Sequence, residues 1–135
     1  MASLVTVRDA YLEQWAEFRR WCATLEQGVV DEPSSVPGWS LLDLVSHFVR
    51  VSETVSFAAS RPSTKQPLTV SEYVASYRDV AQAIADESRV HASGFDDVLA
   101  ELDRSALDAS RALSDGMLEF ATVVENDFLG VSKFK

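Results

Sequence analysis

The N-terminal part of the chain carries apolar residues in steps of three and four, and polar residues fall mostly between them. This spacing is typical of one face of an amphipathic helix, and it predicts a long helix from Leu4 to about Gln27. The next segment contains two prolines and a glycine, which predict a defined turn. The apolar positions of the predicted helix are Leu4, Val7, Tyr11, Trp15, Phe18, Cys22 and Leu25.

Capping residues precede two further apolar patterns. Ser40 and Asp43 have the spacing of a capping box, and we expect the helix that follows them to end near Ser60. Thr69 and Glu72 have the same spacing at the start of a third helix. In a capping box, the two side chains hydrogen-bond to each other's backbone N–H groups, so both pairs predict firmly fixed helix starts.

A fourth helical pattern begins at Asp96 or Asp97 and ends before Gly116. The β-branched run at residues 122–124 predicts a short strand or an extended connector. We therefore predict an all-α, four-helix bundle that forms a single domain over residues 1–135. We expect its main core in the first three helices and its C-terminal helix to be shortened. The expected core residues are Leu4, Tyr11, Trp15, Phe18, Leu25, Leu44, Phe48, Val55, Tyr77, Val80 and Ile84.

Composition and charge argue against several classes of function. The chain has 135 residues, of which 47% are hydrophobic and 24% are charged, the balance of an ordinary globular protein. The formal net charge of −9 would repel nucleic-acid phosphates and anionic lipids. Cys22 is the single cysteine, so no disulfide can form within the chain. Without a signal sequence or a membrane-spanning run, we expect a cytoplasmic protein with no nucleic-acid or membrane partner.

His47 is the residue with the clearest potential for chemistry. The chain has two histidines, which excludes a three-histidine metal site within it. Asp43 lies one helical turn before His47, so both side chains project from the same face, and a carboxylate can orient an imidazole as a metal ligand or an acid–base group. A partly buried structural histidine would show the same pattern. His91 lies at the end of the predicted third helix, where we expect it to cap the helix or to be exposed.

The segment from Pro33 to Phe48 resembles the signature of a known family. It reads Pro-Ser-Ser-Val-Pro-Gly-Trp-Ser-Leu-Leu-Asp-Leu-Val-Ser-His-Phe. A Pro-Gly-Trp turn, a Ser or Thr, an Asp-Leu-Val run and a histidine are the pattern of mycothiol-dependent maleylpyruvate isomerase N-terminal domains. That family belongs to the DinB-like metal-binding four-helix bundles. The segment at residues 67–74 is also similar to family sequence, and the likeness extends to about Asp127-Phe128-Leu129.

The resemblance implies a divalent metal, usually zinc, which would activate the thiol of mycothiol, a small thiol of actinobacteria. In this family the metal ligands are one histidine of the second helix and a glutamate and a histidine of the last helix. His47 matches the first ligand, and Asp43 is the residue expected to orient it. The other two ligands would follow Asp127-Phe128-Leu129, where this sequence continues with Gly-Val-Ser-Lys-Phe-Lys and has no Glu-x-x-x-His.

Two functional hypotheses remain open. The first is a metal-dependent isomerase or transferase that acts on a small-molecule thiol or electrophile. With His47 and only carboxylates such as Glu125 or Asp127 as donors, we expect weak metal binding and little or no isomerase activity, because zinc favours imidazole over carboxylate. The second hypothesis is a non-catalytic helical bundle that associates with a partner helix or forms a homodimer, because a shortened last helix leaves apolar faces uncovered. Metal content and mass in solution distinguish them.

Overall fold

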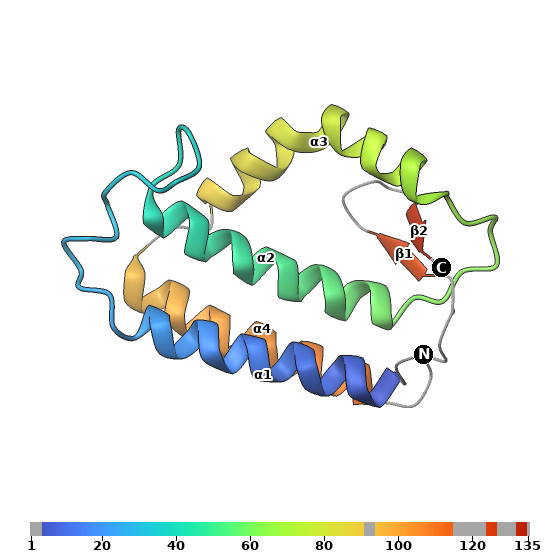
Figure 1. The fold of residues 1–135 in the computed structure, drawn as a ribbon, viewed down its shortest axis with the longest axis horizontal. Helices are drawn as coiled ribbons and strands as arrows, with labels where there is room; N and C mark the ends of the chain where they lie inside the picture. Colours follow the sequence, from blue (N-terminus) through green and yellow to red (C-terminus); the bar gives the residue numbers. More distant parts are fainter. Residues whose placement is uncertain (1–3, 91–93, 115–123, 127–131, 135) are drawn as a thin grey trace.

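Four helices and a small pair of strands make up the described part of the chain (Figure 1). The computed structural model describes residues 4–90, 94–114, 124–126 and 132–134. The helices are α1 (Leu4–Cys22), α2 (Leu41–Ala59), α3 (Val70–Val90) and α4 (Phe95–Ser114). The strands β1 (Val124–Asn126) and β2 (Ser132–Phe134) pair in the antiparallel direction. The predicted all-α, four-helix architecture is confirmed. Of the strand or connector expected at residues 122–124, Val124 lies in β1, and residues 122 and 123 lie outside the described part.

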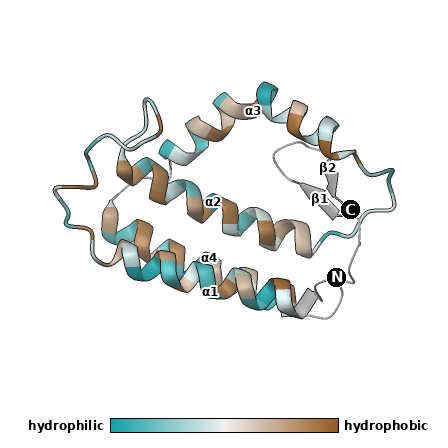
Figure 2. Cartoon of the chain, in the orientation of Figure 1, coloured by the Kyte–Doolittle hydropathy of each residue, from teal (hydrophilic) through white to brown (hydrophobic). Residues whose placement is uncertain are grey.

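The core lies between α1, α2 and α4. Helix α2 packs along α4, and α1 lies against α4 on the same side of the molecule (Figure 1). Apolar residues recur along α2, whereas the side of α1 in view is largely hydrophilic (Figure 2). The buried core cluster takes two side chains from each of the three helices. Its members are Trp15, Cys22, Val45, Val49, Val98 and Leu102.

The expectation that the main core lies in the first three helices is wrong, because α4 takes the place of α3 in the buried cluster. The C-terminal end of α3 lies near the start of α2, and the two helices diverge toward the other end of α3 (Figure 1). Val70 is therefore 80% exposed and Val74 62% exposed. Of the expected core residues, Trp15 and Ile84 are buried, Tyr77 is exposed and the side chain of Leu4 lies outside the described part; Tyr11, Phe18, Leu25, Leu44, Phe48, Val55 and Val80 are partly buried.

Aromatic side chains join α1 to α2. The ring centroids of Phe18 and Phe48 lie 4.2 Å apart, and Trp15 meets Phe48 edge to face at 6.1 Å. The hydroxyls of Tyr11 and Ser52 form a hydrogen bond of 2.8 Å between the same two helices. Aromatic pairs of this kind stabilise a fold by about 0.5–1.5 kcal/mol beyond the burial of their surface.

Helix α1 ends at Cys22, five residues before the predicted end near Gln27. After the last turn, the backbone hydrogen bonds span three residues instead of four, and the Leu25 N–H donates to the Cys22 carbonyl at 3.1 Å. The Thr24 hydroxyl donates to the Trp21 carbonyl at 2.7 Å and so satisfies a carbonyl at the helix end. Leu25 still packs against the core. The apolar spacing therefore continues past the point where the backbone leaves the helix.

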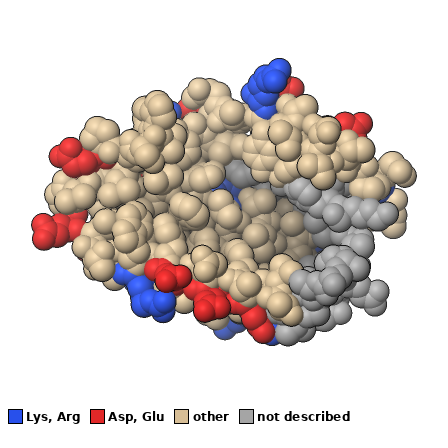
Figure 3. Space-filling model, in the orientation of Figure 1, with Lys and Arg blue, Asp and Glu red and all other residues tan. Residues whose placement is uncertain are grey.

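The surface separates into a charged edge and a largely uncharged face. In the view of Figure 3, acidic side chains gather along the edge formed by α1, whereas most of the surface over α2 and α3 is uncharged. Among the described helices, none combines the length and the apolar character needed to cross a bilayer. The apolar residues of α2 are instead used in packing against the neighbouring helices.

Two leucines of α4 test the position of the core. Leu102 is 0% exposed and Leu107 is 51% exposed. The substitution Leu102→Ala should lower the free energy of unfolding by about 2–5 kcal/mol, because it leaves a cavity among α1, α2 and α4. The matched change Leu107→Ala should cost less than about 0.5 kcal/mol. Chemical denaturation followed by circular dichroism measures both, and equal losses would show that α4 does not supply the core.

Candidate functional site

A tight turn fixes the approach of the chain to α2. The Trp39 N–H donates to the Val36 carbonyl at 3.1 Å, and Gly38 has φ of +80°. With Pro37 at the second position and a left-handed glycine at the third, this is a type II β-turn. The Ser34 N–H also donates to the Trp39 carbonyl at 2.8 Å. The turn thereby places the indole of Trp39 at the N-terminal end of α2.

The predicted capping box at the start of α2 is confirmed. The Asp43 carboxylate accepts a hydrogen bond from the Ser40 N–H at 2.9 Å, and the Asp43 N–H donates to the Ser40 hydroxyl at 3.0 Å. The capping box predicted at Thr69 and Glu72 is confirmed in the same way. The cap at Ser40 satisfies backbone N–H groups that have no partner within the helix and fixes the first turn of α2. His47 follows one turn later.

His47 is a residue of α2 and lies half-buried against the turn and α3. Its ring meets the Trp39 ring edge to face, with centroids 5.4 Å apart and an interplanar angle of 79°. Phe48 approaches from the next position at 6.3 Å. On the α3 side, His47 Nδ1 forms a hydrogen bond of 3.1 Å with the hydroxyl of Ser88, which is completely buried. The imidazole is thus held on two sides by other parts of the chain.

The structure joins His47 to Ser88 and does not join it to Asp43 by a hydrogen bond. Asp43 uses a carboxylate oxygen on the helix cap, one turn before His47. The expected orienting contact therefore comes from α3 in this structure. Ser88 lies 41 residues from His47 in the sequence. A serine within a helix has no pattern that would have indicated this partner.

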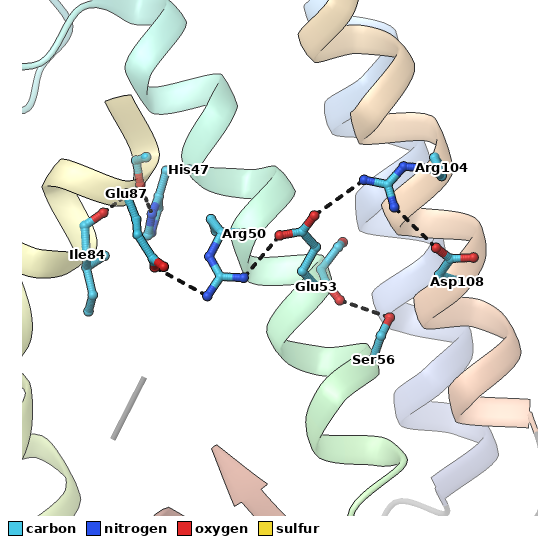
Figure 4. A network of polar contacts seen from close by, with 10 residues as sticks. His47, Arg50, Glu53, Ser56, Ile84, Glu87, Arg104 and Asp108 are labelled. Atoms are coloured by element: carbon cyan, nitrogen blue, oxygen red, sulfur yellow. Dashed lines mark hydrogen bonds and ion pairs between the residues drawn. The ribbon is translucent and has the colours of Figure 1, made fainter. Parts of the chain in front are cut away.

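The surroundings of His47 favour the neutral form of its ring. Burial lowers the pKa of His47, and the nearby positive charge of Arg50 lowers it further. Arg50 forms ion pairs with Glu53 of α2 at 3.0 Å and with Glu87 of α3 at 3.3 Å. Glu53 also pairs with Arg104 of α4 at 3.4 Å, so a line of ion pairs beside His47 connects three helices (Figure 4).

The donors in the described residues fit a divalent metal only in part. The neutral imidazole of His47 is a suitable ligand for zinc. Cys22 is an unsuitable one, because burial raises the pKa of its thiol to about 11 and so disfavours the thiolate that binds metals. Within the described ranges, no three His, Cys, Asp or Glu side chains lie together in a way that could hold a metal ion. His91, Asp127 and the side chain of Glu125 lie outside the described part.

One comparison with known proteins matches most of the chain. The family model of the mycothiol maleylpyruvate isomerase N-terminal domain matches residues 11–119. This interval contains the type II turn, the cap of α2, His47 and Ser88, and it covers most of the chain. Comparison with curated proteins and with solved structures gave no match. On the strength of the family match, the chain belongs to the mycothiol maleylpyruvate isomerase N-terminal domain family.

Proposed function

We propose that this chain is a divalent-metal-binding domain in which His47 anchors the metal. The metal of the proposal is zinc, and the small molecule is the thiol mycothiol or an electrophile that reacts with it. Membership of a family named for mycothiol supports the thiol. The proposal also places the protein in the cytoplasm of an actinobacterium, because actinobacteria are the source of mycothiol. The observation that carries it is the half-buried ring of His47, held between Trp39 and Ser88, where burial lowers the pKa of the imidazole.

The strength of metal binding follows from the donor set. A catalytic zinc site has three protein ligands and an open position for water or substrate. The described residues provide one nitrogen donor and no group of three donors. Carboxylates that complete the coordination would bind zinc less tightly than a second imidazole would. We therefore propose that this chain binds metal weakly and has little or no isomerase activity.

Zinc titration tests the role of His47. Calorimetric titration of the metal-free protein should give weak, saturable binding. The substitution His47→Ala should weaken it by more than roughly tenfold, because even the loss of a residue that merely orients a ligand costs about 10–100-fold. His91→Ala removes the other histidine and serves as the matched control, with unchanged affinity expected. Equal affinities for the wild type and His47→Ala would remove His47 from the site.

Zinc affinity should also depend on pH in a defined way. Protons compete with metal for the imidazole, so binding weakens below the pKa of the free site. Because burial and Arg50 lower the pKa of His47, its competition with protons should begin below the ordinary histidine value of about 6.5. Zinc affinity measured at intervals from neutral to mildly acidic pH should stay level to about pH 6.5 and then fall. A marked fall that is complete above pH 6.5 would contradict the assignment of His47.

Association through α3 is a second candidate function, and one observation favours it. Val70, Val74 and Tyr77 lie one helical turn apart, and all three are exposed. The hydroxyls of Tyr73 and Tyr77 are hydrogen-bonded to each other at 2.5 Å on the same part of the helix. Exposed apolar side chains at this spacing are typical of a helix that packs against a partner. On this hypothesis the protein acts as a non-catalytic module and forms a homodimer.

Mass in solution separates the two candidate functions. If α3 mediates association, light scattering should give the mass of a dimer, and Val74→Glu should convert it to a monomer by placing a charge in the interface. Leu107→Glu on α4 is the matched control, because Leu107 is also exposed but lies on another helix. A monomeric wild type, or a dimer that survives Val74→Glu, would exclude this surface.

A further inference from the structure

Ser88 is a buried residue whose polar groups are used by two consecutive residues of α2. Its carbonyl lies in the last turn of α3, where backbone carbonyls have no N–H partner within the helix. The Ser46 hydroxyl donates to this carbonyl at 2.9 Å. Both Ser46 and Ser88 are 0% exposed, so water does not compete for the bond. The backbone of α3 is therefore fixed against α2 at the position of His47.

The hydroxyl of Ser88 determines how the proton of His47 is placed. The Ser88 hydroxyl donates to the Ile84 carbonyl at 2.9 Å, and a carbonyl can only accept. A hydroxyl has one proton, so the Ser88 oxygen is left to accept from His47 Nδ1 at 3.1 Å. With the Ser88 proton directed to the Ile84 carbonyl, Nδ1 carries the proton of the neutral ring. In the neutral ring, the lone pair is consequently on Nε2.

We propose that Ser88 is a positioning residue, which holds His47 as the Nδ1–H tautomer and makes Nε2 the atom that binds a divalent cation. The role of Nε2 as a metal donor rests on the proposed function, whereas the tautomer does not. Metal-binding histidines generally donate their second N–H to a carboxylate, a carbonyl or water. Here a serine hydroxyl, turned into an acceptor by its own bond to Ile84, supplies that contact.

The surroundings of Ser88 show why its position is fixed. Arg89 donates to the Gly38 carbonyl at 3.2 Å and so connects the end of α3 to the turn before α2. Glu87 forms its ion pair with Arg50 at 3.3 Å, one turn along α2 from His47 (Figure 4). Contacts therefore hold α3 through the residues on both sides of Ser88. In water, neutral histidine favours the opposite Nε2–H tautomer. A fixed acceptor at Nδ1 should therefore change which ring nitrogen of His47 carries the proton.

Nitrogen NMR of the imidazoles tests the tautomer without metal. Protein labelled with ¹⁵N-histidine is examined at a pH above 7, and long-range ¹H–¹⁵N correlations identify which ring nitrogen of His47 carries the proton. The wild type should show a protonated Nδ1 and an unprotonated Nε2. Ser88→Ala should shift the population toward the Nε2–H tautomer. Ser88→Thr, which keeps the hydroxyl, should retain the Nδ1–H form.

Ser105→Ala is the matched control for these variants. Ser105 is also a buried helical serine whose hydroxyl donates to a carbonyl of its own helix, that of Leu102 at 3.1 Å, and it forms no hydrogen bond with His47. Its removal should leave the His47 tautomer unchanged. If Ser88→Ala does not fold, the wild-type spectrum still decides the question. A wild-type His47 in the Nε2–H form would overturn the inference.

Zinc binding to the same proteins tests whether Ser88 positions Nε2 of His47 for a divalent cation. Ser88→Ala should lower zinc affinity by about 10–100-fold relative to the wild type, and Ser105→Ala should leave it unchanged. A shifted tautomer with unchanged zinc affinity would overturn the positioning role of Ser88. An Nδ1–H tautomer in a wild type that binds no zinc would instead refute the proposed function and leave the assignment of the tautomer intact.

Discussion

The packing of α2 against α4 is the interaction on which the rest of the structure depends. Val45 and Val49 of α2 lie in the same buried cluster as Val98 and Leu102 of α4, and the exposure of each is 1% or less. Burial of such side chains stabilises a fold by about 1.5–3 kcal/mol each. Because α4 occupies this face of α2, α1 reaches α2 through long aromatic side chains. The face that carries His47 is left for α3.

Alongside the buried side chains of Ile84 and Ala85, α3 is attached to α2 by several directed polar contacts, and these give α3 a different role from α4. A hydrogen bond or an exposed ion pair contributes only about 0–1.5 kcal/mol to stability, but it has a defined direction. Three such contacts join the two helices: the hydrogen bonds of Ser46 and His47 with Ser88, and the ion pair of Arg50 with Glu87. They orient α3 and His47 more than they stabilise the fold. Stability is supplied by the apolar core, and the geometry at His47 by the end of α3.

Sequence reasoning succeeded where neighbouring residues decide the structure. The capping box of Ser40 and Asp43 spans three residues, and its spacing alone was enough to predict it. The same reasoning failed for the core, because the period of an apolar stripe identifies a buried face and not the helix that covers it. Tyr77 shares a stripe with Ile84, but Tyr77 is 40% exposed whereas Ile84 is 8% exposed. The partner of His47 was missed because Ser88 lies on another helix, 41 residues away in the sequence.

Nitrogen NMR of the ¹⁵N-histidine protein during a zinc titration tests most directly whether His47 anchors a metal through Nε2. We expect the Nε2 resonance of His47 to shift in proportion to bound zinc, while Nδ1 keeps its proton and the ring resonances of His91 do not change. If both nitrogens of His47 keep their free-state positions at saturation, or if Nδ1 loses its proton and takes up the metal, then His47 does not bind zinc in the way proposed here.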